Sequence, residues 1–255
     1  MTSDSPATPS ERPIVAFFDV DNTLMRGTSL FHLGVEAWRS GVIGWRDIVP
    51  FAWHQLRFIR KGENHAHLGT AQERALTLVG GHTSAEVREL AEHIWTRIQP
   101  RLWPETVELA REHLAKGHEV WLISATPREV GELIARRLGL TGALGTIAEE
   151  DDGVYTGRLL GHVLHGERKA IVARELLTGL GADFADCWAY SDSRNDIPLL
   201  TLVGHPTVVN PDPGLALHAS SHGWPVLRLA KSSITAARKR VKREARAVRR
   251  ESRRR

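Results

Sequence analysis

The chain of 255 residues is 42% hydrophobic and 25% charged, as is typical of a soluble globular protein. Its single cysteine, Cys187, excludes an internal disulfide framework and favours a reducing compartment. The net charge of +4 conceals a mildly acidic body, −6 over residues 1–230, and a basic tail, +10 over residues 231–255, so the overall charge says little about the body.

The first predicted elements are a polar leader and a strand that ends in acidic residues. Residues 1–12 lack the basic-then-apolar order of a signal peptide, and we expect them to form a disordered leader. Residues 14–18 form an apolar run that predicts a buried strand, with Asp19 and Asp21 behind it. Two carboxylates at a strand end repel each other and lose hydration, so a cation is expected to compensate them.

Residues 28–100 break the alternation of strands and helices. They contain four tryptophans and several helical patterns but no convincing strand, which predicts a helical cap inserted after the first strand. The longest apolar stretch, residues 48–59, is too short to span a membrane, so we expect a cytoplasmic protein. The core is then expected in the two flanking segments, residues 13–27 and 101–230.

Strands and helices alternate in the chain that follows. Three apolar runs predict strands over residues 119–124, 186–191 and 206–210. Three amphipathic patterns predict helices over residues 104–117, 126–139 and 166–181. Thr126 and Glu129 are expected to form a capping box for the second helix. Residues 147–160 predict a hairpin that turns at Asp152 and Gly153.

These elements predict an α/β fold, a doubly wound parallel-sheet core of Rossmann type with the inserted helical cap. In such a sheet, ligands bind at the carboxyl ends of the strands. The polar residues that follow or precede the predicted strands are therefore expected to converge on one site, and they are Asp19, Asp21, Ser124, Lys169, Asp192 and Asp196.

The order of these segments resembles the haloacid dehalogenase superfamily of phosphohydrolases. The matching segments are DVDNT at 19–23, Ser124, Lys169 and SDSRND at 191–196, and the resemblance covers roughly residues 13–215. With its helical insertion between the first two motifs and the segments ISAT, GERKA and SDSRND, the chain looks most like the phosphoserine-phosphatase-like branch. Dehalogenases of this superfamily lack the second aspartate, which is present here as Asp21, so phosphate chemistry is favoured.

The resemblance implies a role for each matching residue. Asp19 would be the nucleophile that forms an aspartyl-phosphate, and Asp21 the general acid and base. Mg²⁺ would be bound by Asp19, the carbonyl of Val20 and Asp192, with Asp21 in the same site. The phosphoryl group would be held by Thr23, Ser124 and Lys169, and Asn195 and Asp196 would support the metal waters and orient Lys169.

Simpler explanations of the same residues remain. DVDNT does not begin an EF-hand, because the sixth and twelfth positions are Leu24 and Leu30 rather than Gly and Glu. Arg168 and Arg174 compete with Lys169 for its role. Asp196 lies three residues after Ser193 and fits a capping box. The histidines form no pattern typical of a zinc site.

The expected substrate is a small phosphorylated metabolite. Phosphoserine is the named alternative, because the family's glutamate that binds the substrate amino group corresponds to Thr28 here. A second alternative is a non-catalytic interaction protein with a vestigial phosphate pocket. The basic tail is expected to be a solvated extension that contacts anionic membrane or nucleic acid peripherally, without specific base readout.

Overall fold

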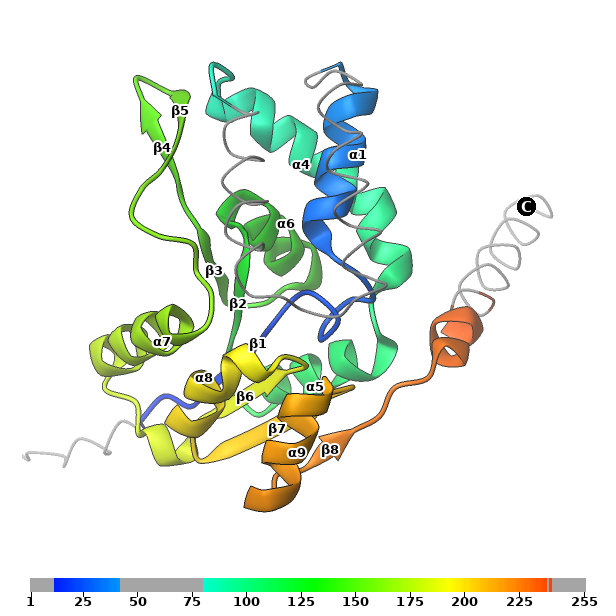
Figure 1. The fold of residues 1–255 in the computed structure, drawn as a ribbon, viewed down its shortest axis with the longest axis vertical. Coiled ribbons are helices and arrows are strands. Elements are labelled where there is room, and N and C mark those ends of the chain that lie inside the picture. The colour runs from blue at the N-terminus through cyan, green and yellow to red at the C-terminus, as the bar shows by residue number, and fades with distance from the viewer. Residues whose placement is uncertain (1–11, 42–79, 238, 240–255) are drawn as a thin grey trace, which may run out of the picture.

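The structure is a computed structural model, and it describes residues 12–41, 80–237 and 239. Its core is one parallel sheet with the strand order β3-β2-β1-β6-β7-β8. The strands are β1 (Val15–Phe18), β2 (Glu119–Pro127), β3 (Gly142–Thr146), β6 (Trp188–Ser191), β7 (His205–Val209) and β8 (Val226–Leu227). This arrangement, with helices on both faces (Figure 1), confirms the predicted α/β fold.

The two faces of the sheet are buried by different helices. Val15 and Phe17 of β1 belong to the apolar cluster on one face, whereas Ala16 and Phe18 belong to the cluster on the other. The alternation follows from the period of two in a strand. The first face is covered by α7 (Glu167–Leu180), α8 (Ile197–Leu202) and α9 (Pro213–His222), and the second by α5 (Pro104–Ala115) and α6 (Arg128–Leu138).

All four strands and all three helices predicted from the sequence are present, with ends shifted by up to three residues. Strands β3 and β8 were not predicted. Strand β3 carries Gly142 and Gly145, which weaken a strand pattern. At Gly142 a Cβ atom would lie 2.5 Å from the ring of Trp121, and at Gly145 it would lie 2.6 Å from the backbone of Arg128. Close packing of β3 against β2 and α6 therefore requires glycine at both positions. The same glycines are the reason that the sequence pattern did not predict a strand here.

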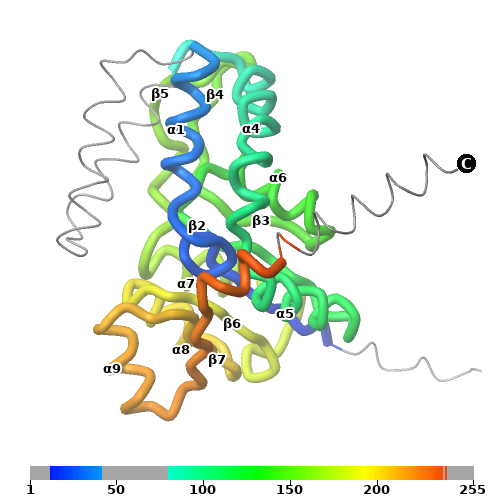
Figure 2. The backbone as a smooth tube through the Cα atoms, turned by 90° about the vertical axis from the view of Figure 1, so that its right-hand side faces the viewer, coloured from blue at the N-terminus to red at the C-terminus, as the bar shows by residue number. Residues whose placement is uncertain are grey.

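Two helices of the predicted cap lie within the described residues. Helices α1 (Ser29–Arg39) and α4 (Ser84–Ile98) stand side by side at one end of the molecule (Figures 1 and 2). Arg97 Nε donates to Glu36 Oε2 across them at 2.7 Å. Residues 42–79, including the apolar stretch 48–59, lie outside the described residues, so the extent of the cap stays a prediction.

The predicted hairpin is present as β4 (Ala148–Asp151) and β5 (Val154–Leu159). It is joined to the start of α4 by backbone hydrogen bonds, from Ser84 N to Gly153 O at 2.9 Å and from Gly81 N to Tyr155 O at 2.8 Å. The Tyr155 hydroxyl donates to Glu129 Oε1 of α6 at 2.9 Å. The hairpin thus connects the cap helix α4 to the core helix α6.

The two connections between core and cap lie against each other. Trp103 N donates to Leu24 O at 2.9 Å, and Arg26 N donates to Arg101 O at 2.8 Å. The short 3-10 helix Gln99–Arg101 precedes this crossing. The chain therefore leaves the core and returns to it through one paired junction.

Residues 231–237 of the predicted tail are helical, and Ile234 is buried. Residues 238 and 240–255, which carry most of its basic side chains, lie outside the described residues. Among the helices that are described, none combines the length and the apolar character needed to cross a membrane.

Candidate active site

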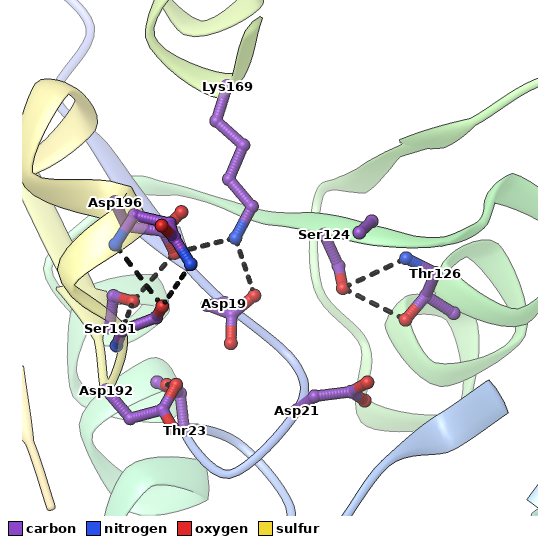
Figure 3. A network of polar contacts seen from close by, with 12 residues as sticks. Asp19, Asp21, Thr23, Ser124, Thr126, Lys169, Ser191, Asp192 and Asp196 are labelled. Atoms are coloured by element: carbon purple, nitrogen blue, oxygen red, sulfur yellow. Dashed lines mark hydrogen bonds and ion pairs between the residues drawn. The ribbon is translucent and has the colours of Figure 1, made fainter. Parts of the chain in front are cut away.

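The predicted site residues lie where β1 and β6 run side by side and the order of strands reverses. Chain order proceeds from β1 to β2 and β3 on one side, and the later strands β6, β7 and β8 lie on the other. Asp19 N donates to Tyr190 O at 3.0 Å, which holds the residue after β1 against β6. This switch point is where open α/β sheets bind ligands. Figure 3 shows the predicted side chains around it.

Lys169 is the centre of the polar network. Its Nζ atom donates to Asp19 Oδ1 and to Asp196 Oδ2, each at 2.7 Å, and the residue is 3% exposed. Of its two competitors, Arg168 is exposed and Arg174 lies over the ring of Phe184. Lys169, and neither arginine, is therefore the residue that lies between the two aspartates.

Asp196 is held as a partner of Lys169. Its Oδ2 atom accepts a second hydrogen bond from Ser191 Oγ at 2.7 Å. The Asp196 side chain does not form the alternative capping box with Ser193. Ser193 Oγ instead accepts from Asn195 N at 3.3 Å and from Asn195 Nδ2 at 3.1 Å. Asp196 thus contacts both Lys169 and Ser191, whereas Asn195 contacts Ser193.

Burial governs the charges in this network. The pKa of Asp19 is raised to about 7: burial is the main cause, the Lys169 ammonium opposes it, and nearby Asp196 and Asp21 add to the rise. Burial lowers the pKa of Lys169, but the carboxylates of Asp19 and Asp196 more than compensate and the pKa lies above its ordinary value. Lys169 is therefore positively charged, and one ammonium does not neutralise the surrounding acids.

Asp21 is held by the first turn of α1. The N–H of Ser29, the first residue of that helix, donates to Asp21 Oδ1 at 2.8 Å. Burial raises the pKa of Asp21, while the N–H and the hydroxyl of Ser29 lower it. An anionic carboxylate at a helix N-terminus is stabilised by the helix dipole. The cap helix thus contacts a predicted catalytic group directly.

The loop after β1 brings Thr23 to Asp192. Thr23 Oγ1 donates to Asp192 Oδ1 at 3.3 Å. The turn depends on Asn22, whose φ of 60° is left-handed and whose Oδ1 accepts from Gly27 N at 3.1 Å. Asparagine adopts this conformation more readily than most residues. The turn therefore returns the chain to the site before α1 begins.

Ser124 is buried at the end of β2, and Thr126 lies beside it. Ser124 Oγ and Thr126 Oγ1 are 2.9 Å apart, and Thr126 N donates to Ser124 Oγ at 3.2 Å. The predicted capping box of Thr126 and Glu129 is wrong. Strand β2 continues to Pro127, and α6 begins at Arg128 without a side-chain cap, so Thr126 belongs to the strand and its hydroxyl to the site.

The predicted metal ligand Val20 does not fit. Its carbonyl oxygen accepts backbone hydrogen bonds from Leu24 N at 3.1 Å and from Met25 N at 3.0 Å. Since a carbonyl oxygen has two lone pairs, this turn occupies both. The prediction of Val20 as a ligand is corrected for this reason.

The remaining donor set fits a hard divalent cation. Two carboxylates, those of Asp19 and Asp196, contact the Lys169 ammonium, and those of Asp21 and Asp192 are held nearby by Ser29 and Thr23. Asp196 Oδ1 is buried without a hydrogen-bond partner in the described part of the chain. That part contains no group of three His, Cys, Asp or Glu side chains arranged for a metal. Mg²⁺ needs only one or two protein carboxylates, because water and substrate phosphate complete its octahedron.

Sequence reasoning missed two hydroxyls of the site. Ser29 Oγ and Thr126 Oγ1 are 2.6 Å apart, and both residues are buried. Ser29 was counted with the cap, and Thr126 was explained as a helix cap. The signal available in the sequence was the position of Thr126, two residues after Ser124, which places both side chains on one face of an extended strand.

The fold and the site together define a class, a Rossmann-like α/β enzyme with an acid cluster and a buried lysine at the switch point of its sheet. Residues 16–201 match the family model of the haloacid dehalogenase-like hydrolases. The chain belongs to this family, and it is an enzyme that hydrolyses phosphoric monoesters.

Three relatives illustrate the similarity. Phosphoserine phosphatase SerB1 of Mycobacterium tuberculosis is 44% identical over 220 residues, which cover 86% of this chain and 71% of the relative. A histidinol-phosphatase of Neisseria meningitidis is 31% identical over 221 residues, covering 84% and 97%. A crystal structure from Bordetella pertussis, described as a protein of unknown function, is 32% identical, covers 84% and 98%, and has a TM-score of 0.74.

Proposed function

We propose that the protein is a Mg²⁺-dependent phosphatase that hydrolyses a small-molecule phosphomonoester through a phosphorylated Asp19. The observation that carries this proposal is the buried Lys169, bonded to Asp19 and Asp196 at 2.7 Å each, beside two further aspartates at the switch point of the sheet. Burying an ammonium and two carboxylates costs desolvation energy, which their mutual attraction only partly offsets. Such a cluster is therefore a reason to expect a functional role.

Lys169 orients the carboxylate group of Asp19. It binds Oδ1, so the other carboxylate oxygen is the one to attack phosphorus, while the bond from phosphorus to the alcohol oxygen breaks. Asp21 gives its proton to that oxygen, and the alcohol leaves. A water then attacks phosphorus and gives a proton to Asp21, which releases phosphate and restores Asp19. Thr23, Ser124 and Lys169 would hydrogen-bond the phosphoryl oxygens in both steps.

Mg²⁺ would be held by the carboxylates of Asp19 and Asp192. A bound Mg²⁺ would neutralise negative charge on the phosphoryl oxygens and on Asp19. We place the carbonyl ligand at Asp21 in place of Val20, because the Asp21 carbonyl accepts no hydrogen bond in the described loop. Asp192 is kept in place by Thr23.

The test is turnover of p-nitrophenyl phosphate with and without Mg²⁺. We expect wild type to be active with Mg²⁺ and inactive after chelation, and Asp19→Asn to lose at least about 10³-fold in kcat. Asp152→Asn is the matched control, because Asp152 lies at an exposed left-handed turn that asparagine also adopts. Equal slow release by wild type and Asp19→Asn would instead support the non-catalytic alternative with a vestigial pocket.

A small phosphorylated metabolite is the substrate class that the relatives support. Two of them carry the names phosphoserine phosphatase and histidinol-phosphatase. Phosphoserine is the second candidate, favoured by the relative with 44% identity. Against it, Thr28 is uncharged where the family places a glutamate for the amino group; it lies directly before α1. The test compares kcat/KM for phosphoserine, histidinol phosphate and phosphates without an amino group. A clear preference for phosphoserine would favour the second candidate over another small phosphorylated metabolite.

The basic tail is a separate proposal, namely that it attaches the enzyme to an anionic lipid surface. Residues 240–255 carry nine Lys or Arg against two Glu, and each basic residue near such a surface contributes about 1 kcal/mol. Deleting residues 240–255 spares the buried Ile234. The deletion should abolish salt-sensitive binding to vesicles containing phosphatidylserine and leave turnover unchanged. Unchanged vesicle binding, or binding to DNA alone, would contradict this proposal.

A further inference from the structure

Three buried hydroxyl groups form a row between the cap helix and the phosphate side of the site. Ser29 Oγ lies 2.6 Å from Thr126 Oγ1, which lies 2.9 Å from Ser124 Oγ. The three residues are 0%, 3% and 4% exposed, respectively. Ser29 begins α1 of the cap, and the other two lie on β2 of the core. Bulk water therefore does not compete for these contacts.

Each end of the row meets a group with a proposed role in the reaction. At one end, the Ser29 N–H donates to Asp21 Oδ1 at 2.8 Å, and the Ser29 hydroxyl acts with it to lower the pKa of that carboxyl against the effect of burial. At the other end, Ser124 Oγ is the proposed phosphoryl ligand and accepts from Thr126 N at 3.2 Å. The row thus connects the phosphoryl side of the site to the proposed general acid. Figure 3 shows the contact between Ser124 and Thr126 in this row.

A row of hydroxyls can be ordered in two directions. Each hydroxyl carries one proton to donate, so the direction chosen at one end favours the same direction along the row. In the first direction, Ser124 would donate to Thr126, Thr126 to Ser29, and Ser29 to Asp21. In the second direction, with phosphate bound, Ser124 would donate to a phosphoryl oxygen, Thr126 to Ser124, and Ser29 to Thr126.

We propose that Ser29 and Thr126 are positioning residues that report phosphoryl binding at Ser124 to the Asp21 carboxyl by reversing this row of hydroxyl groups. The inference rests on the proposed function and deepens it. In the reversed state Asp21 keeps the Ser29 N–H but loses the Ser29 hydroxyl. The carboxyl is then released from one of its two donors only when a phosphoryl group is in place, and it becomes available to the leaving oxygen.

A purely structural role for the same hydroxyls has a different consequence. Loss of buried hydrogen bonds that only hold β2 and α1 together would lower stability and reduce turnover of every substrate by the same factor. Loss of control over Asp21 would mainly affect substrates that need their leaving oxygen protonated. Phenyl phosphate needs such protonation more than p-nitrophenyl phosphate, because phenoxide is the more basic leaving group.

The experiment compares kcat/KM of the full-length enzyme with Mg²⁺ for these two substrates of similar shape. Thr126→Val keeps the shape but removes the middle hydroxyl. We expect it to lower kcat/KM for phenyl phosphate about tenfold more than for p-nitrophenyl phosphate, a part of the effect usual for general acid catalysis. Thr126→Ser restores the hydroxyl and should restore the wild-type ratio of the two values. Ser29→Ala should behave like Thr126→Val.

Thr106→Val is the control, because Thr106 is also fully buried and its hydroxyl binds only the backbone of the core-to-cap junction. It should leave the ratio unchanged. An equal loss with both substrates in Thr126→Val and Ser29→Ala would overturn the inference and leave the proposed function standing. If one variant fails to fold, the other decides. A wild type that hydrolyses neither substrate would overturn both.

Discussion

Lys169 lies between two buried carboxylates. Its side chain is 4% exposed, and those of its partners Asp19 and Asp196 are 8% and 2% exposed. Removing one member of a buried ion pair leaves the others uncompensated, which is more costly than the pair is favourable. The charged contacts of Lys169 are therefore already formed in the folded protein without substrate.

We predict that Lys169→Met destabilises the protein by about 3–5 kcal/mol in the absence of Mg²⁺. Asp19 and Asp196 would remain buried without a counterion, and Mg²⁺ should recover part of the loss by replacing the missing charge. Urea unfolding with chelator and with Mg²⁺ measures both effects. Arg168→Met is the matched control, since Arg168 is the exposed neighbour on the same helix turn. Equal unfolding midpoints for the two variants would contradict the prediction.

Individual site residues were predictable where the chemistry demands a charged group. Asp19, Asp192 and Lys169 follow or precede strands at positions where a charge needs a partner. In the structure Lys169 contacts Asp19, and Asp192 contacts Thr23 of the loop that follows Asp19. Val20 and Thr126 were misjudged because their roles depend on backbone geometry. The turn at Leu24 and Met25 takes the Val20 carbonyl, and the continuation of β2 past Ser124 takes Thr126 out of the helix. Neither the turn nor the continuation of the strand can be predicted from the type of the residue concerned.

Among the elements, the junction of α4 with the hairpin ties the cap to the core. Thr83 and Glu86 form a capping box at the start of α4, with Glu86 N to Thr83 Oγ1 at 3.2 Å and Thr83 N to Glu86 Oε2 at 2.7 Å. The next residue, Ser84, donates to the hairpin at Gly153 O. Fraying of this end would therefore loosen both the helix and its contact with β4 and β5.

Thr83→Ala should lower the free energy of unfolding by about 1 kcal/mol, the usual cost of losing a helix N-cap. Amide exchange should increase at residues 84–87 and at Gly153 and Tyr155, because the cap and the hairpin share backbone bonds. Thr96→Ala, an exposed change on the same helix, should cost less, since alanine has the higher helix propensity. Denaturant unfolding and exchange mass spectrometry test this, and unchanged protection at the hairpin would refute the coupling.

The strands of the fold were predictable where an apolar run in the sequence is long enough to be recognised as a strand. Strands β1, β2, β6 and β7 carry the buried aliphatic and aromatic side chains of the sheet centre. Strand β3 was missed because Gly142 and Gly145 are needed for close approach, and β8 because it has only two residues. Edge strands depend on tertiary packing more than on their own pattern.

Across the whole molecule, buried histidines connect pH to stability. Burial lowers the pKa of His32 and of His113 to about 4, with the nearby Arg101 and Arg97 adding to the effect at His32 and His118 and Lys116 at His113. The rings of His113 and His118 are joined through Nδ1 at 2.8 Å, and His113 Nε2 meets the Tyr190 hydroxyl at 2.9 Å. These histidines are neutral in the folded state.

We predict that acid destabilises the protein through these groups. Between about pH 6.5, the ordinary histidine pKa, and about pH 4, the unfolded chain binds protons that the folded chain does not. The histidine contribution is therefore complete above pH 6.5 and declines as pH falls. The carboxyls of Asp19 and Asp21 act in the opposite direction, because their raised pKa values favour proton binding in the folded state.

The measurement is accordingly a difference between variants. Urea unfolding of wild type and His113→Gln from pH 7.5 to 4.5 should show a weaker loss of stability in the variant as pH falls. His93→Gln, at an exposed position of α4, is the control and should follow wild type. Parallel curves for wild type and His113→Gln would rule out the assigned role of His113.

The paired junction at Leu24, Arg26, Arg101 and Trp103 has a consequence for how such enzymes diversify. Because the two chain segments of the junction are hydrogen-bonded to each other, the two ends of the predicted insertion are held side by side. A different insertion could join the same two ends while Asp19, Asp192 and Lys169 keep their places. Transplanting a foreign insertion between these fixed ends is therefore a rational route to a new substrate preference in an unaltered catalytic frame.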